Sequence, residues 1–239
     1  MSMGKTNLKE VPNFIPKFIR YETLKVVDPL TETQSIVFQE YEKGRHLMLD
    51  GCAGTGKTFI AIYLALKEIL LRESEYDKLI IVRSVVPVRE EGFLPGTQEE
   101  KELVYQAPYH AIFKKLFYDK DIIKKITEQG LYEFMSTSYI RGVTINKAIV
   151  IVDEASNLSL HELDSIITRL GDDTRIVFCG DFNQSDLTKN SDRNGYLEFK
   201  RIIESMGKHF SFVEFDEEDI VRSDLVKSYI IAKNRLGIK

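Results

Sequence analysis

The chain has 239 residues, of which 43% are apolar and 29% are charged, and its net charge is −4. This balance is typical of a globular domain with a sizeable core, and it excludes a protein whose whole surface coats nucleic acid, although a local basic patch is compatible with it. Two cysteines make no disulfide framework, and no apolar run approaches a membrane span. We therefore expect a reduced, cytoplasmic setting and no membrane partner.

The first 27 residues are polar, with two prolines and scattered aromatic residues, and are expected to form a loosely held arm before one domain over 28–239. In chain order, the patterns then predict a helix over 31–41, a strand over 46–50, a helix over 58–72, a strand over 78–83, a loop over 90–96, helices over 108–117 and 121–128, short strands over 131–135 and 142–144, a strand over 148–152, a helix over 160–170, a strand over 175–179, a helix over 196–206, a strand over 210–215 and a helix over 223–233. Such alternation indicates an α/β fold with a mainly parallel sheet covered by helices on both faces.

The stretch GCAGTGKT, residues 51–58, fits the pattern G-x-x-x-x-G-K-[ST] and lies between a predicted strand and a predicted helix. Glycines bring backbone N–H groups close to phosphates, and the following helix points its positive end at them. The lysine of this pattern reaches the β- and γ-phosphates, and its threonine is a Mg²⁺ ligand. A plain glycine turn would need no such flanks. We therefore expect ATP to be bound by Gly51, Ala53, Gly54, Thr55, Gly56, Lys57 and Thr58.

Two adjacent carboxylates, Asp153 and Glu154, follow the apolar strand AIVIV. Ligands of a parallel sheet gather at the carboxyl ends of its strands, so Asp153 is expected to face the phosphate loop and to hold Mg²⁺, through water. Glu154 is placed to orient and deprotonate the attacking water, which favours hydrolysis over phosphoryl transfer. The alternative, an acidic cap of the following helix, explains the pair less well beside a phosphate loop.

A third polar stretch follows the strand over 175–179. Gly180, Asp181 and Gln184 lie just past the strand end, where they are expected to meet the nucleotide. A glutamine can hydrogen-bond the γ-phosphate and lose that contact after hydrolysis, so Gln184 is a candidate catalytic residue. A solvated turn is the alternative for this stretch.

The order G-x-x-x-x-G-K-T, D-E-A-x-N and G-D-x-x-Q resembles the PhoH-like ATPases, a RecA-like branch near the superfamily 1 helicases. Four further stretches resemble segments of that family: VRSVVPVREEGFLPG (82–96), PYHAIF (108–113), SYIRGVTINKA (138–148) and EEDIVRSDLVKSYI (217–230). The likeness covers about residues 28–233 and is greatest to short phage-encoded members. It implies a single RecA-like P-loop domain, Mg²⁺-dependent ATP hydrolysis, and translocation on or unwinding of RNA or single-stranded DNA in a bacterial or infected-host cytoplasm.

The resemblance also assigns roles at matching positions. Gln34, in LTETQ, resembles the glutamine that reads the adenine edge, and Arg222 resembles the arginine of the C-terminal motif. One departure is Ser156, which stands where the family usually has a glutamine and has a shorter reach. It puts the link between the hydrolysis site and a nucleic-acid site in question, but leaves Asp153 and Glu154 intact.

A helicase needs two RecA-like lobes or two subunits around the nucleotide, and this chain is long enough for one lobe. We therefore expect a homo-oligomer, a hexameric ring as the resemblance suggests, in which Arg222 or Arg141 crosses the cleft to stabilise the γ-phosphate. Nucleic acid is expected to contact Arg83, Arg89 and Phe93 past one strand, and Arg141 past another. Ordinary surface residues are the alternative for these basic and aromatic side chains.

Two other functions are compatible with a phosphate loop. A nucleotide-dependent switch would bind a protein partner and turn over slowly. A small-molecule kinase would need an acceptor pocket and a mobile lid, often rich in arginine; we find no such lid, and Glu154 suits water activation better.

Overall fold

The computed structural model describes residues 19–85, 98–181 and 190–237. Six strands of these residues form one sheet in the order β3-β2-β4-β5-β1-β6, and every neighbouring pair is parallel. The strands are β1 (His46–Gly51), β2 (Lys78–Arg83), β3 (Tyr132–Ser136), β4 (Ala148–Val152), β5 (Thr174–Cys179) and β6 (Phe210–Phe215). The strand order separates β1 from β4 by one strand, β5.

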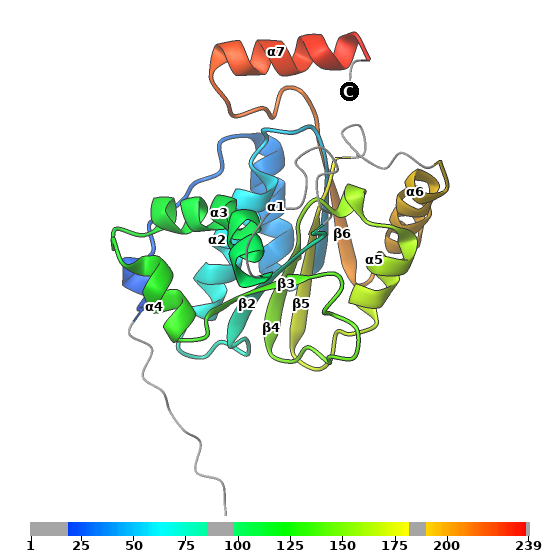
Figure 1. Ribbon diagram of the computed structural model, residues 1–239. Coiled ribbons are helices and arrows are strands. Elements are labelled where there is room, and N and C mark those ends of the chain that lie inside the picture. The colour runs from blue at the N-terminus through cyan, green and yellow to red at the C-terminus, as the bar shows by residue number, and fades with distance from the viewer. Residues whose placement is uncertain (1–18, 86–97, 182–189, 238–239) are drawn as a thin grey trace, which may run out of the picture.

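Helices cover both faces of this sheet (Figure 1). One face carries α1 (Glu32–Glu42), α2 (Lys57–Ile69), α3 (Gln98–Leu116) and α4 (Ile122–Glu128), and the other carries α5 (Leu160–Ile167) and α6 (Asn190–Ser205). Helix α7 (Asp224–Arg235) lies across the carboxyl edge of the strands. Two short 3₁₀ helices span Tyr21–Thr23 and Ala155–Asn157. The expected α/β architecture, a parallel sheet covered by helices on both faces, is confirmed.

The side chains on the two faces of the central strands belong to two separate hydrophobic clusters. In β4, Ile149 and Ile151 pack under α1 to α4, whereas Val150 and Val152 pack under α5 and α6, and all four are fully buried. A strand buried on both faces needs apolar side chains at every position, which is why this strand is a continuous apolar run in the sequence.

Three expected elements differ from the structure. Helix α3 begins at Gln98, ten residues before the expected start, and carries Pro108 inside it. That proline removes the bond to the carbonyl of Val104, which lies on an exposed stretch that water can reach. Helix α6 begins at Asn190 and includes Gly195, where a Cβ would lie 3.0 Å from that of Leu160. The glycine is needed there for close packing of α6 against α5, so it does not mark a helix start.

The strand expected over 142–144 is absent from this described stretch. Gly142 has a φ of +88°, which turns the chain, and Val143 is 42% exposed. Only the next residue, Ile145, forms a bridge, with Leu170. The described end of the N-terminal arm also packs against the domain, because Ile19 and Leu24 belong to the hydrophobic core.

None of the helices in the described ranges has an apolar run long enough to cross a bilayer.

Candidate active site

The glycine-rich loop joins the end of β1 to the start of α2 at the carboxyl edge of the sheet (Figure 1). Gly51, Gly54 and Gly56 have φ of +118°, +79° and +86°, a region that side-chain-bearing residues rarely adopt. Gly51 is also pressed against β6, since a Cβ on it would lie 2.0 Å from the carbonyl oxygen of Phe215. The loop therefore takes its curled shape because its glycines permit both the backbone angles and this close approach.

Lys57 begins α2 and turns back into the curl of the loop. Its ammonium donates to the carbonyl oxygens of Gly51 at 2.8 Å and Cys52 at 2.6 Å, and to the Thr55 hydroxyl at 3.3 Å. The side chain is 9% exposed, and burial lowers the pKa of Lys57, although the Asp181 charge opposes that shift. A buried cation held at a helix N-terminus, beside backbone N–H groups, is suited to binding phosphate oxygens.

Thr58 and Asp153 are in contact at the carboxyl edge of the sheet. The Thr58 hydroxyl donates to Asp153 Oδ1 at 2.7 Å, which brings together the two residues expected to hold Mg²⁺. The second oxygen, Asp153 Oδ2, accepts from the hydroxyl of Tyr109 at 2.8 Å. A hydroxyl and a carboxylate in contact are oxygen ligands of the kind that Mg²⁺ prefers, so these residues fit the metal.

Tyr109 is a site residue that sequence reasoning missed. It lies on α3 and is 1% exposed, and burial together with the Asp153 charge raises the pKa of its hydroxyl. The sequence offered one signal, the Pro108-Tyr109 pair within a stretch that resembles the family. That signal does not say which carboxylate the hydroxyl would meet.

Glu154 has a left-handed backbone, with φ of 55° and ψ of 38°, which is uncommon for a residue with a side chain. Its Oε1 lies 3.5 Å from Nη2 of Arg83, and its Oε2 accepts from Asn157 Nδ2 at 3.4 Å. Arg83 ends β2, the strand beside β4. The arginine that we expected to contact nucleic acid thus lies against the expected water-activating residue.

The stretch after β5 is tied to the turn that carries Glu154. The Asp181 backbone N–H donates to the Ser156 hydroxyl at 3.2 Å, and Ser156 is 2% exposed. Serine in place of the family glutamine therefore still links the end of β4 to the end of β5. Gln184 lies outside the described residues.

Gln34 contacts both the phosphate loop and the turn before α1. Its Nε2 donates to the carbonyl oxygen of Thr55 at 2.9 Å, and its Oε1 accepts from the N–H of Leu30 at 2.7 Å. The side chain is 3% exposed. Adenine reading by Gln34 stays a prediction; the observed contacts make it a brace between the loop and the turn before α1.

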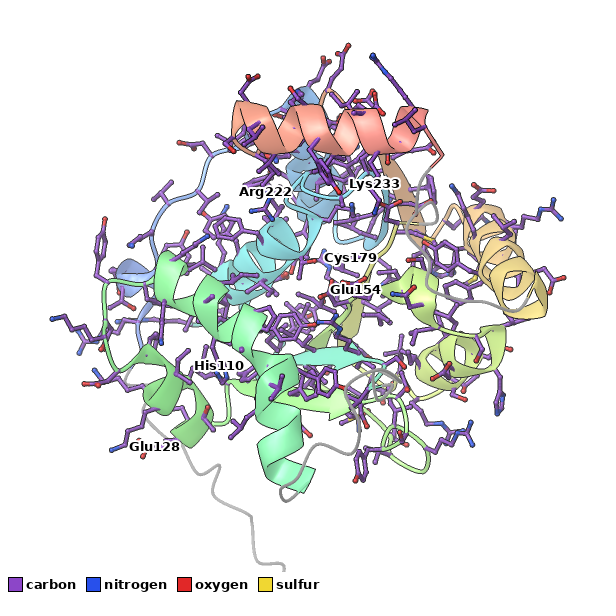
Figure 2. All side chains as sticks on the ribbon, turned by 45° about the horizontal axis from the view of Figure 1, so that its top comes forward. His110, Glu128, Glu154, Cys179, Arg222 and Lys233 are labelled. Carbon is purple, nitrogen blue, oxygen red and sulfur yellow. The ribbon has the colours of Figure 1, made fainter. Side chains whose placement is uncertain are left out.

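Arg222 lies over the loop of its own chain. A Cβ on Gly54 would be 3.1 Å from Cγ of Arg222, and the N–H of the preceding Val221 donates to the Gly54 carbonyl at 3.0 Å. Figure 2 shows Arg222 beneath α7, on the same side of the molecule as Glu154 and Cys179. Arg222 therefore lies at the phosphate loop of its own chain.

A buried ion pair lies directly behind the loop, and no pattern in the sequence indicated it. Asp50 is 3% exposed, accepts from the Tyr196 hydroxyl at 3.1 Å and accepts from Lys200 Nζ at 2.9 Å. Both partners lie on α6. The last side chain of β1 before the loop is thus fixed by the helix that follows the third polar stretch.

Three of the predicted residues remain to be placed. Arg141 is exposed in the connection between β3 and β4, near Tyr139, which is 51% exposed. Arg89 and Phe93 lie outside the described residues.

A parallel sheet with a glycine-rich loop between β1 and α2, a lysine inside that loop, and a threonine bonded to the carboxylate after β4 defines a P-loop NTPase domain. The model of one family within this class, described as "PhoH-like protein", matches residues 26–233. The chain belongs to the PhoH-like protein family.

Two relatives show how much of the family this chain represents. A PhoH-like protein of Synechocystis sp. is 35% identical over 187 residues, which are 77% of this chain and 55% of the relative. A PhoH-like protein of Bacillus subtilis is 34% identical over 187 residues, or 77% and 57% of the two chains. This chain thus spans a little over half the length of these relatives. Among solved structures, the helicase domain of Pyrococcus furiosus Hef is 14% identical with a TM-score of 0.44, over 78% of this chain and 38% of that one.

Proposed function

We propose that this chain is a Mg²⁺-dependent ATPase that couples hydrolysis to movement on, or remodelling of, RNA or single-stranded DNA. The observation that carries the proposal is the 2.7 Å hydrogen bond from Thr58 to Asp153, with Glu154 next along the chain. It joins a phosphate loop, a metal-binding pair and a candidate base at one edge of the sheet.

Each residue has a part in this reaction. Backbone N–H groups of the loop and the ammonium of Lys57 bind the phosphates, while Thr58 and Asp153 hold the metal. Bound Mg²⁺ supplies charge neutralisation at the phosphate oxygens. Glu154 accepts the proton of the attacking water, and Arg222 and Gln184 stabilise the γ-phosphate charge as the bond breaks.

The nucleic-acid half of the proposal rests on the carboxyl edge of the sheet. Tyr139 and Arg141 are exposed there, an aromatic ring and a cation of the kind that stack a base and bind a phosphate. Arg89 and Phe93 are proposed as further contacts. Binding of this kind weakens as salt is raised, because phosphate contacts release counterions.

A homo-oligomer, in the form of a hexameric ring, is part of the same proposal. Arg222 lies at its own loop, so Arg141 is the better candidate for an arginine supplied to a neighbouring subunit. Helix α7 carries no buried residue and exposes Leu225 and Tyr229, which suits an interface. The same exposed helix is the one observation that favours the second candidate, a nucleotide-dependent switch with a protein partner.

The test is phosphate release from Mg²⁺-ATP, with and without a single strand of RNA or DNA. We expect turnover that a strand stimulates, and a loss of at least about 100-fold in Glu154→Gln. Glu128→Gln, the same change at an exposed glutamate of α4, is the matched control and should behave as wild type.

Each result separates the parts of the proposal. Turnover indifferent to every strand would remove the nucleic-acid half and leave an ATPase. ATP binding without turnover would favour the switch. Appearance of a phosphorylated small molecule would favour the kinase.

A further inference from the structure

The carboxylate proposed to activate water is not presented freely to a nucleotide. Glu154 Oε1 is 3.5 Å from the guanidinium of Arg83, and the two side chains are 48% and 27% exposed. Glu154 Oε2 is bonded to Asn157. A carboxylate whose two oxygens face a guanidinium and an amide is held in one orientation. Glu154 has to turn away from Arg83 before it can orient a water molecule at a bound nucleotide.

The backbone holds Arg83 next to this carboxylate. Strands β2 and β4 pair with Val82 opposite Val152, and the Asp153 N–H donates to the Val82 carbonyl at 2.9 Å. Arg83, the next residue of β2, therefore emerges beside Asp153 at the carboxyl edge, and Glu154 follows one position later. The pairing of β2 with β4 thus brings Arg83 to the turn that carries Glu154, where the two side chains are 3.5 Å apart.

Arg83 also borders the surface proposed to bind single-stranded nucleic acid. Its carbonyl accepts from the N–H of Thr137 at 3.3 Å, at the start of the β3–β4 connection that carries Tyr139 and Arg141. A guanidinium that is 27% exposed can be reached from solution. Phosphate oxygens match its planar fork as well as a carboxylate does.

We propose that Arg83 is a positioning residue that is exchanged between Glu154 and a phosphodiester of the bound strand. Without bound nucleic acid, Arg83 restrains Glu154 and turnover of ATP is slow. A strand phosphate takes the guanidinium, Glu154 is released to orient water, and hydrolysis speeds up. The inference rests on the proposed function, because it needs Glu154 to be the base, and it adds the link by which a strand controls that base.

The test is Arg83→Met, which keeps much of the side-chain volume and removes the charge. We expect strand-free turnover to rise about fivefold, the equivalent of losing a partly exposed ion pair of about 1 kcal/mol. Addition of a strand should then stimulate turnover little further. Strand affinity, measured by fluorescence anisotropy, should fall, and its salt dependence should lose about one phosphate contact.

A matched control lies on the same β-strand, β2. Lys78→Met removes the Lys78–Glu133 pair, 2.7 Å long and at the opposite end of β2, and should leave turnover and stimulation unchanged. Arg83→Lys keeps a charge without the fork and should fall between wild type and Arg83→Met. It also serves as the test variant if Arg83→Met does not show the wild-type thermal transition.

Strand-free turnover that is unchanged or reduced in a folded Arg83 variant would overturn the inference, as would a rise with undiminished stimulation. These results leave the proposed function standing wherever Glu154→Gln is inactive. Full turnover in Glu154→Gln would instead overturn the proposed function, and the inference with it.

Discussion

The hydroxyl of Tyr109 orients Asp153 from the side opposite to Thr58, so the carboxylate is held between two donors. We expect Tyr109→Phe to raise the Mg²⁺ concentration needed for half-maximal turnover severalfold, because Asp153 would be free to turn. The ring stays buried, so the free energy of unfolding should fall by only about 1 kcal/mol. Mg²⁺ titrations of phosphate release provide the measurement. Tyr132→Phe, at another buried tyrosine, should leave the titration unchanged; the same curve for both variants would contradict the role of Tyr109.

His46 makes the fold sensitive to acid. Burial, with the Arg175 and His209 charges, lowers the pKa of His46 below its usual 6.5, and its Nδ1 accepts from the Ile176 N–H at 3.3 Å. The unfolded chain therefore binds a proton more readily than the folded one. Stability is full above about pH 6.5 and should decrease as the pH falls through the window between that value and the lowered pKa.

Urea unfolding at pH 7.5 and at pH 5.5 measures this effect. His46→Gln should show a smaller loss of stability between the two pH values than wild type, and His110, whose pKa is also lowered by burial, should account for part of what remains. The exposed His161 provides the control, and His161→Gln should keep the wild-type loss. An equal loss in His46→Gln and wild type would exclude His46 as a cause.

At the scale of elements, the contact between the phosphate loop and β6 depends on one missing side chain. Gly51→Ala would place a methyl group 2.0 Å from the Phe215 carbonyl oxygen at a φ of +118°. We expect a loss of about 3 kcal/mol or more in the free energy of unfolding, with ATP affinity lost as β1 and β6 separate.

Gly130→Ala is the matched comparison. Gly130 also has a positive φ, +63°, but no atom lies within 4 Å of its added Cβ. The change should cost about 1 kcal/mol, for the left-handed backbone alone. Equal losses in thermal or denaturant unfolding at both glycines would show that the approach of β6 to the loop contributes little.

The sequence predicted best those elements whose burial repeats locally. Strand β4 is apolar on both faces, and its bounds agree with the expected 148–152. Helices α3 and α6 begin earlier than expected because both contain a residue that usually interrupts helices. Pro108 is tolerated where water reaches the unpaired Val104 carbonyl, and Gly195 is needed for close packing against Leu160. The strand expected over 142–144 did not form, because its β-branched residues follow a turn at Gly142.

The residues of the candidate site likewise divide into those that a local sequence pattern predicts and those whose contacts no local pattern predicts. The loop and the Asp153–Glu154 pair were predictable because a short stretch of chain carries the whole pattern. The contacts of Tyr109 with Asp153 and of Lys200 with Asp50 join residues 44 and 150 positions apart, and no local pattern specifies such partners. Arg83 was recognised as a cation past a strand end, but only the folded structure shows its guanidinium 3.5 Å from Glu154.

At the scale of the molecule, α7 has no buried residue. Leu225 is 79% exposed and Tyr229 is 67% exposed, at a position where an interface between copies would cover them. We expect the wild-type protein to assemble in the presence of Mg²⁺-ATP, and Leu225→Glu with Tyr229→Glu to weaken assembly at least tenfold. Sedimentation velocity over a concentration series provides the measurement.

Tyr118→Glu, at an 82% exposed tyrosine far from α7 in the fold, is the control and should assemble as wild type. A wild-type protein that stays monomeric at high concentration would rule out the ring. Unchanged assembly of the α7 variant would move the interface to another surface.

The hydrogen bond from the Val221 N–H to the Gly54 carbonyl has a mechanical consequence. It fastens the segment before α7 to the middle of the phosphate loop, so a force applied to that helix is transmitted to the loop. A tether or a solid support attached at α7 would therefore load the nucleotide-binding loop directly, whereas one attached at α4, beside the other end of the strands, would not.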